Sequence, residues 1–242
     1  MHKLEVKDLK KTIKKTEIIK GISLEENSGE VVGLLGPNGA GKTTTFYMIC
    51  GLISPTSGDV FLDDQKITSV PLHKRAHLGI GYLPQESSIF KELSVEENLL
   101  LGAEILDQNT EEISKKVNEM LNMLNIEPIR LRKGVSLSGG ERRRCEIARS
   151  LIIKPKFLLL DEPFAGVDPI AVSDIQSIVR DLKKLGIGVL ITDHNVRETL
   201  AICDRAYVIK DGSLLASGSA SEVANNKLVR THYLGEEFKL LE

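Results

Sequence analysis

One glycine-rich stretch of the chain has the residue types and spacing that could hold phosphate groups. Residues 36–43 fit the pattern G-x-x-x-x-G-K-[ST] in full. Glycines let consecutive backbone N–H groups turn toward one anion, and a following helix adds the partial positive charge of its N-terminus. The stretch predicts a site for nucleotide phosphates made by Gly36, Pro37, Asn38, Gly39, Ala40, Gly41, Lys42, Thr43 and Thr44.

Within that stretch, Lys42 is expected to bridge two phosphates and the Thr43 hydroxyl to hold Mg²⁺. Two adjacent carboxylates, Asp161 and Glu162, follow the apolar run 157–160. A carboxylate at the end of a buried strand can bind Mg²⁺ through water, and its neighbour can orient or deprotonate an attacking water. An acidic turn ended by Pro163 is an equally good interpretation of the pair alone, but the phosphate loop favours catalysis.

A second candidate anion site lies at residues 137–141. Ser138 is expected to be the N-cap of a helix, and Gly139 and Gly140 leave free N–H groups in its first turn. Two separate phosphate-binding motifs in one chain suggest that two chains share each nucleotide. The motif by itself would more simply be an ordinary capped helix.

The elements that would position these residues follow from hydrophobic periodicity. Residues 1–30 alternate in the manner of antiparallel strands, whereas the run 31–35 is apolar throughout and predicts a strand buried on both faces. Further strands are expected at 60–62, 80–83, 157–160 and 188–192, with a hairpin at 207–216. Helices are expected at 44–50, 94–106, from a cap at Thr110 to 124, 138–152, 170–185 and from Ser219 onward.

The composition limits the classes of protein and of partner. The 242 residues are 41% hydrophobic with a net charge of −2, which suits one large or two small globular domains and argues against general binding to nucleic acid or anionic membranes. Arg142–Arg144 is therefore interpreted as an exposed helix face with ion pairs. The three scattered cysteines predict free thiols, and neither a signal peptide nor a run of about 18–20 apolar residues for membrane insertion is expected.

The order of the motifs resembles that of the ATP-binding subunits of ABC transporters. The phosphate loop is followed by Gln85, then by residues 137–141, by Asp161-Glu162, by residues 165–168 and by His194. The resemblance covers essentially the whole chain. It implies an α/β P-loop NTPase core (1–86 and 153–218) with an antiparallel β subdomain, an inserted α-helical subdomain (about 87–152) and a C-terminal extension (about 219–240), all in one ATP-binding domain (1–240).

The resemblance also implies a role for each residue, with ATP and Mg²⁺ as cofactors. Lys42, Gln85, Glu162 and His194 would be catalytic: Glu162 as the general base, His194 at the γ-phosphate, and Gln85 at Mg²⁺ and the attacking water. Thr43, Gln85 and Asp161 would hold the metal. Ser138, Gly139 and Gly140 would clamp ATP held by a partner chain. Asp168 would cross the dimer interface.

One position departs from the family pattern. The family usually carries an aromatic ring in an early loop, where it stacks on adenine. By position this residue is Ile13, which can pack on a purine but offers no π-stacking.

Within the family, Ser138–Arg144 and the tail 233–238 look most like the ATPases that power lipopolysaccharide export. That branch implies a homodimer on the cytoplasmic face of the inner membrane, beneath two integral membrane permease subunits. Phe90 and Leu93 would contact those subunits, although Phe90 packing within the helical subdomain is an equally good interpretation. No nucleic-acid partner is expected. The alternatives are the ATPase of a branched-chain amino-acid uptake transporter and a soluble ABC ATPase outside transport.

Overall fold

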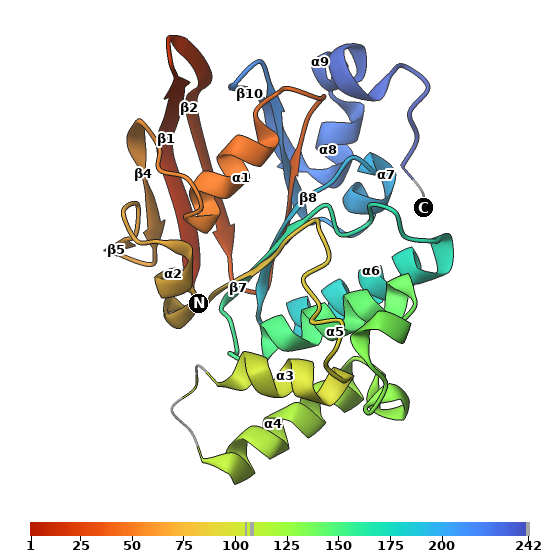
Figure 1. The fold of residues 1–242 in the computed structure, drawn as a ribbon. Coiled ribbons are helices and arrows are strands. Elements are labelled where there is room, and N and C mark those ends of the chain that lie inside the picture. Colours follow the sequence, from red (N-terminus) through yellow and green to blue (C-terminus); the bar gives the residue numbers. More distant parts are fainter. Residues whose placement is uncertain (105, 107–108, 241–242) are drawn as a thin grey trace.

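The computed structural model describes residues 1–104, 106 and 109–240 (Figure 1). Within these residues, ten strands form two sheets, ordered β2-β1-β4-β5 and β10-β9-β3-β8-β7-β6. The strands are β1 Lys3–Ile13, β2 Thr16–Asn27, β3 Val31–Leu35, β4 Ser57–Leu62, β5 Gln65–Lys66, β6 Ile80–Leu83, β7 Phe157–Asp161, β8 Gly188–Thr192, β9 Arg205–Lys210 and β10 Ser213–Ser219.

The described residues also form nine α-helices and three short helical turns. The α-helices are α1 Lys42–Cys50, α2 Leu72–Leu78, α3 Val95–Ala103, α4 Thr110–Met123, α5 Gly139–Leu151, α6 Pro169–Lys184, α7 Val196–Leu200, α8 Ala220–Asn225 and α9 Lys227–Val229. The turns are Glu127–Ile129, Gly134–Ser136 and Arg230–Leu234. None of the described helices is both long enough and apolar enough to cross a membrane.

The smaller sheet is antiparallel, as the alternating pattern predicted. Leu4 and Val6 of β1 are buried because side chains at alternate positions face one side of a strand. Leu9 is buried as well, after a register shift between Val6 and Leu9 that restores the inward orientation. All three pack together with α1 and with one face of the larger sheet, through Val32 and Leu34 of β3. Figure 1 shows α1 between the two sheets. The smaller sheet and α1 therefore cover one face of the larger sheet.

The larger sheet has parallel strands at its centre. β3 pairs in parallel with β8, β8 with β7, and β7 with β6, while β9 and β10 form the predicted antiparallel hairpin. Every residue of β3, β7 and β8 is buried because the second face is covered as well. Helices α5 and α6 supply that cover, through Ile147, Ile175 and Val179.

The helical segment keeps most of its predicted caps and differs in two details. Ser94 and Ser138 both form the predicted capping boxes. Helix α3 ends at Ala103 instead of 106, and residue 105 of the predicted helix lies outside the described residues. The cap of α4 is Asn109 and not Thr110, because the Asn109 side chain accepts a hydrogen bond from the Glu112 N–H and leaves residue 110 in the first turn.

The carboxyl group of Glu26 on β2 is buried in the core. Its two side-chain oxygens accept no hydrogen bond from any residue that the structure describes. The Cα of Gly188 lies beside it, and a Cβ at that glycine would come within 2.9 Å of Glu26 Oε1. Burial, and then the negative charge of Glu30, raise the pKa of Glu26 well above its ordinary value. The native state therefore keeps this proton to a higher pH than the unfolded chain does.

We predict that Glu26→Gln changes the pH dependence of stability. Because the folded pKa is raised, wild-type stability falls as pH rises above the unfolded pKa of about 4.3. Glutamine cannot ionise, so the melting temperature of the variant should rise relative to wild type between pH 5 and pH 8. Thermal unfolding of both proteins across that range tests this. The exposed-site variant Glu17→Gln should follow wild type, and a constant offset for Glu26→Gln would contradict the prediction.

Candidate functional site

Four adjacent parallel strands carry the predicted site residues at one edge of the larger sheet. The phosphate loop follows β3, His194 follows β8, Asp161 and Glu162 stand at the end of β7, and Gln85 follows β6. The order β3-β8-β7-β6 places these four strand ends side by side. Ligands of open α/β sheets bind at this edge, beyond the carboxyl ends of the strands.

The phosphate loop needs glycine at two positions, at Gly36 because a backbone oxygen leaves no space and at Gly41 because of its positive φ. A Cβ on Gly36, whose φ is 147°, would lie 2.0 Å from the carbonyl oxygen of Ile209. A Cβ on Gly41, at φ 103°, would lie 2.4 Å from Ile19 Cδ1. Helix α1 begins at Lys42, two residues before the predicted start, so Lys42 and Thr43 stand in its first turn. The free N–H groups of that turn are available to an anion.

The ammonium group of Lys42 lies across the loop. Its Nζ donates to the carbonyl oxygens of Gly36 at 2.6 Å and Pro37 at 3.1 Å. The residue is buried, and burial lowers the pKa of the ammonium while the nearby charge of Glu162 opposes that effect. A weakly solvated cation held in this position is suited to a phosphate group.

Both oxygens of the Glu162 carboxylate are held by other predicted site residues. Gln85 Nε2 donates to Glu162 Oε2 at 2.7 Å, and His194 Nε2 lies 2.8 Å from Oε1. The backbone of Glu162 has a φ of 45°, and its N–H donates to the Thr192 carbonyl at 2.7 Å. Residues that follow three different strands thus meet at one carboxylate. Such a carboxylate can accept a proton from a water held between these groups.

The neighbouring Asp161 is deeply buried, with 2% of its surface exposed. Burial, and then the charge of Glu162, raise the pKa of Asp161. The donor atoms available beside the loop are the Asp161 carboxylate, the exposed Thr43 hydroxyl and the Gln85 amide oxygen. The described residues contain no group of three or more His, Cys, Asp or Glu side chains that could hold a metal. The mixed oxygen donors fit Mg²⁺, which binds through few protein ligands and completes its shell with phosphate and water.

Asp193 is a structural residue that the sequence analysis missed. It is buried at the end of β8, where its carboxylate accepts from the N–H groups of Phe164 at 2.8 Å and Asn195 at 2.7 Å. Burial raises its pKa. Asp193 therefore ties the loop after Glu162 to the loop that carries His194. Its position in the sequence, between a predicted buried strand and His194, could have identified it.

The motif at 137–141 forms a second surface, next to the start of α6. Ser138 caps α5 and shares a capping box with Glu141. Gly139 has open space where a Cβ would stand, and a Cβ on Gly140 would lie 3.1 Å from Ala171 Cβ on α6. Asp168 is the N-cap of α6 and accepts from the Ala171 N–H at 3.0 Å. Within the described part of the chain, no hydrogen bond or ion pair joins this surface to Lys42, Gln85, Glu162 or His194.

Ile13 stands at the end of β1, where half of its surface is exposed. It precedes the turn into β2, and β2 passes the phosphate loop at Ile18 and Ile19, beside Gly41. The fold thus presents Ile13 on the hairpin that borders the phosphate loop. Its aliphatic side chain is available to a flat ring.

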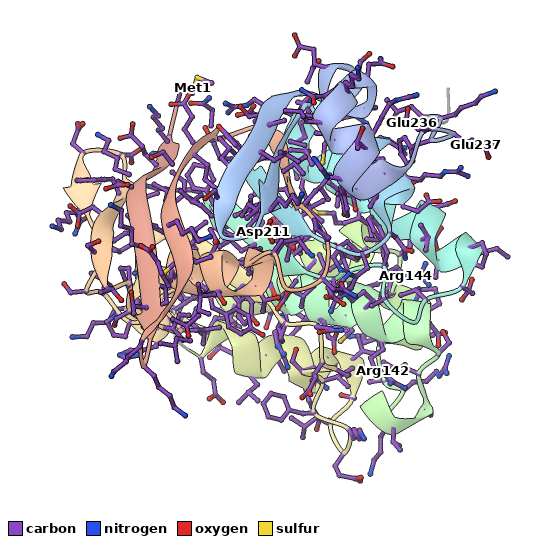
Figure 2. The ribbon with its side chains drawn as sticks, turned by 90° about the horizontal axis from the view of Figure 1, so that it is seen from above. Met1, Arg142, Arg144, Asp211, Glu236 and Glu237 are labelled. Carbon is purple, nitrogen blue, oxygen red and sulfur yellow. The ribbon has the colours of Figure 1, made fainter. Side chains whose placement is uncertain are left out.

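The prediction that Arg142–Arg144 form an exposed helix face is wrong for Arg143. Arg144 forms an ion pair with Asp174 at 2.9 Å, and Arg142 donates to the Leu137 carbonyl at 3.2 Å. Figure 2 shows both on the side of the molecule away from Met1. Arg143 is buried instead, with 7% exposed, because the helix turns it toward the sheet. There it donates to the backbone oxygens of Pro84 and Asp161.

Comparison with known proteins gives matches over nearly the whole chain. Residues 19–165 match the family model described as ABC transporter. The lipopolysaccharide export system ATP-binding protein LptB of Escherichia coli K12 is 54% identical over 241 residues, covering 99% of this chain and 100% of that relative. The crystal structure of the ADP conformation of an ATP-binding cassette of an ABC transporter matches with a TM-score of 0.87 at 30% identity, covering 98% of this chain and 100% of that one.

A further match is a dimer. The dimeric structure of a post-hydrolysis state of an ATP-binding cassette, bound to ADP and Pi, has a TM-score of 0.77 at 27% identity. The match covers 90% of this chain and 98% of that one.

We predict that Gly36→Ala destabilises the protein more than Gly39→Ala. The added methyl would overlap the Ile209 carbonyl, which belongs to a paired strand and cannot easily move, whereas the position at Gly39 is open. Overpacking of this kind costs about 1–3 kcal/mol. Thermal unfolding should show a melting temperature lower by roughly 2–12 °C for Gly36→Ala. Equal melting temperatures for the two variants would contradict the steric account of the loop.

Proposed function

The chain belongs to the ABC transporter family of ATP-binding proteins, and we propose that its ATP hydrolysis powers lipopolysaccharide export from the inner membrane. The convergence of Gln85 and His194 on Glu162, beside the phosphate loop, is the observation that carries hydrolysis. The cargo follows from the near-complete match to a lipopolysaccharide export ATPase.

For the chemistry, we propose that the phosphate loop and Lys42 bind the β- and γ-phosphates of ATP. Glu162 accepts a proton from water as the water oxygen attacks the γ-phosphorus, and the bond from that phosphorus to the bridging oxygen breaks to give ADP and phosphate. Gln85 and His194 orient the Glu162 carboxylate. Thr43, Asp161 and Gln85 would hold Mg²⁺, which neutralises phosphate charge when bound.

We propose that two chains share each ATP. The N–H groups at the start of α5 form an anion site that is separate from the phosphate loop of the same chain. Ser138, Gly139 and Gly140 would clamp the γ-phosphate held by the partner chain, and Asp168 would cross the interface. Two exposed apolar side chains flank these motifs: Val135 is 60% exposed and Ile170 is 78% exposed. The dimeric relative supports this assembly.

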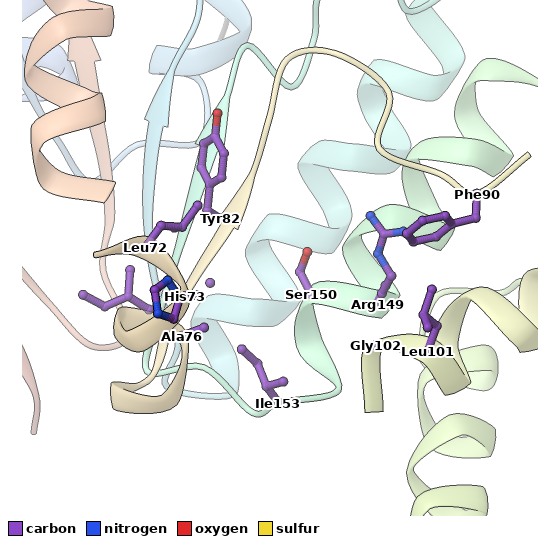
Figure 3. A pocket seen from close by; sticks show the side chains of 12 residues that line it. Leu72, His73, Ala76, Tyr82, Phe90, Leu101, Gly102, Arg149, Ser150 and Ile153 are labelled. Atoms are coloured by element: carbon purple, nitrogen blue, oxygen red, sulfur yellow. The ribbon is translucent and has the colours of Figure 1, made fainter. Parts of the chain in front are cut away.

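A groove between the core and the helical segment is the proposed contact with the permease subunits. It is lined by Leu72, His73 and Ala76 of α2 on one side and by Leu101 of α3, Arg149 of α5 and Phe90 on the other (Figure 3). The Phe90 side chain is 48% exposed, which favours a partner contact over packing within the helical segment. A short amphipathic helix could place apolar residues in such a groove. Leu93, which is half-buried, would border it.

This contact would hold the homodimer on the cytoplasmic face of the inner membrane, beneath two permease subunits. The chain itself would not insert into the bilayer. Its helical segment (about 87–152) would lie against the permeases, and the core (1–86 and 153–218) would bind ATP. The extension from about 219 to 240 packs on the core through Val223, Val229 and Phe238.

We predict that Glu162→Gln abolishes turnover while ATP still binds. Loss of the base should lower kcat by at least about 100-fold, and the variant should accumulate as an ATP-bound dimer. Lys42→Ala should instead weaken ATP binding, because the phosphates lose their buried cation. Phosphate-release assays, nucleotide binding and size-exclusion chromatography with ATP separate the two effects. A Glu162→Gln variant with wild-type turnover would remove Glu162 as the base.

A membrane pull-down tests the proposed partners. Tagged Glu162→Gln protein, mixed with ATP and detergent-solubilised native membranes, should capture two permease subunits with periplasmic domains, identified by mass spectrometry. Adding Phe90→Ala should reduce capture but leave ATP binding intact, because Phe90 lies in the groove and not at the phosphate loop. Capture of a compact amino-acid permease pair would favour the uptake transporter, and ribosomal or DNA-bound partners without permeases would exclude transport.

A further inference from the structure

Three charged side chains on one face of α5 reach the segment that joins Gln85 to Phe90. Arg143, Glu146 and Arg149 are spaced by three residues, which places them on one side of the helix. Each of them contacts residues 84–90. The segment is therefore held by α5.

Glu146 is the centre of this arrangement. It is 3% exposed, and its Oε1 accepts from the Ser87 hydroxyl at 2.8 Å, the Ser88 N–H at 2.7 Å and the Ile89 N–H at 3.2 Å. Its Oε2 accepts from Arg143 at 3.3 Å. A buried carboxylate with four donors, one of them cationic, makes strong charge-assisted hydrogen bonds. Glu146 thus holds the backbone amides of Ser88 and Ile89 in addition to the Ser87 side chain.

The two arginines extend the contact to both ends of the segment. Arg143 donates to the Pro84 carbonyl at 3.0 Å, next to Gln85, and to the Asp161 carbonyl at 3.4 Å, next to Glu162. Arg149 donates to the Ser88 hydroxyl at 2.6 Å, and its guanidinium lies 5.2 Å from the centre of the Phe90 ring (Figure 3). The two ends of the segment are thus the carboxylate site and the proposed permease groove.

We propose that Glu146 is a positioning residue that makes residues 84–90 move as one body with α5. Gln85 reaches Glu162 only while this connection holds, so Glu146 sets the orientation of the catalytic carboxylate. A displacement of Phe90 by a partner then reaches Gln85 through a rigid segment instead of being lost in a flexible loop. The effect on turnover rests on the proposed function, whereas the effect on the segment does not.

The informative variant is Glu146→Gln. Glutamine keeps the shape and one accepting oxygen but loses the charge, and its amide N–H groups would face Arg143. Removing the whole side chain with Glu146→Ala would leave the buried Arg143 without its carboxylate, which is destabilising in itself. A single exposed donor offers a milder change, because Ser87→Ala deletes one of the four hydrogen bonds at the surface.

The experiment combines amide hydrogen exchange with ATPase kinetics on the full chain. Replacing a charged acceptor by a neutral one should speed exchange of the Ser88 and Ile89 amides by about tenfold or more. The kcat for ATP should fall by roughly five- to twentyfold, with KM changed less than about twofold, because Gln85 orients Glu162 for the chemical step while the phosphate loop and Lys42 supply most of the ATP binding. The control Asp174→Asn, which removes the Arg144 ion pair on another face of α5, should leave all three quantities unchanged.

Ser87→Ala should speed exchange of the same two amides by a smaller factor, and its effect should not add to that of Glu146→Gln, since both break the same interaction. Wild-type exchange at Ser88 and Ile89 in both variants would overturn the proposal. So would a rise in KM accompanied by faster exchange throughout the helical segment, which indicates general destabilisation. If the unaltered chain hydrolyses no ATP, the proposed function fails, while the exchange measurement still decides whether Glu146 holds the segment.

Discussion

Parallel pairing of β3, β8, β7 and β6 is the constraint from which the site follows. Strands paired in parallel end at the same edge, so the loops after them meet whatever their separation along the chain. The pairing in turn requires apolar cover on both faces, which α1 with the smaller sheet supplies on one side and α5 with α6 on the other. Asp193 then fixes the loops after β7 and β8 to each other.

Helix α5 serves two surfaces at once. Its N-terminus presents Ser138–Gly140 beside α6, and its middle holds the segment that carries Gln85. Arg143 and Glu146 follow its first turn in the same helix. The geometry thereby connects the surface proposed for the partner chain to the carboxylate of the chain's own site.

Helix α1 is held by a buried cation at its C-terminal end. Its N-terminus faces the phosphate loop, whereas at its C-terminus the fully buried Arg75 donates to the carbonyls of Met48 and Ile49. Cations stabilise the C-terminal end of a helix, where carbonyl groups lack partners. Burial lowers the pKa of Arg75 to about 10, so the guanidinium remains charged at neutral pH. Arg75 thus helps to fix the helix that presents Lys42 and Thr43.

Local patterns were enough to predict the phosphate loop, the buried strands, the capping boxes and the position of Glu162 after an apolar strand, because each depends on residues close together in the chain. The cap at Asn109 and the end of α3 were mispredicted, since neighbouring residues compete for a helix end. The meeting of Gln85 and His194 at Glu162 depends on the order of strands in the sheet. The burial of Arg143 and Glu146 depends on how α5 is rotated when it packs. The strand order and the rotation of α5 depend on which faces of strands and helices bury apolar surface against elements far away in the sequence. No short stretch of sequence contains that information.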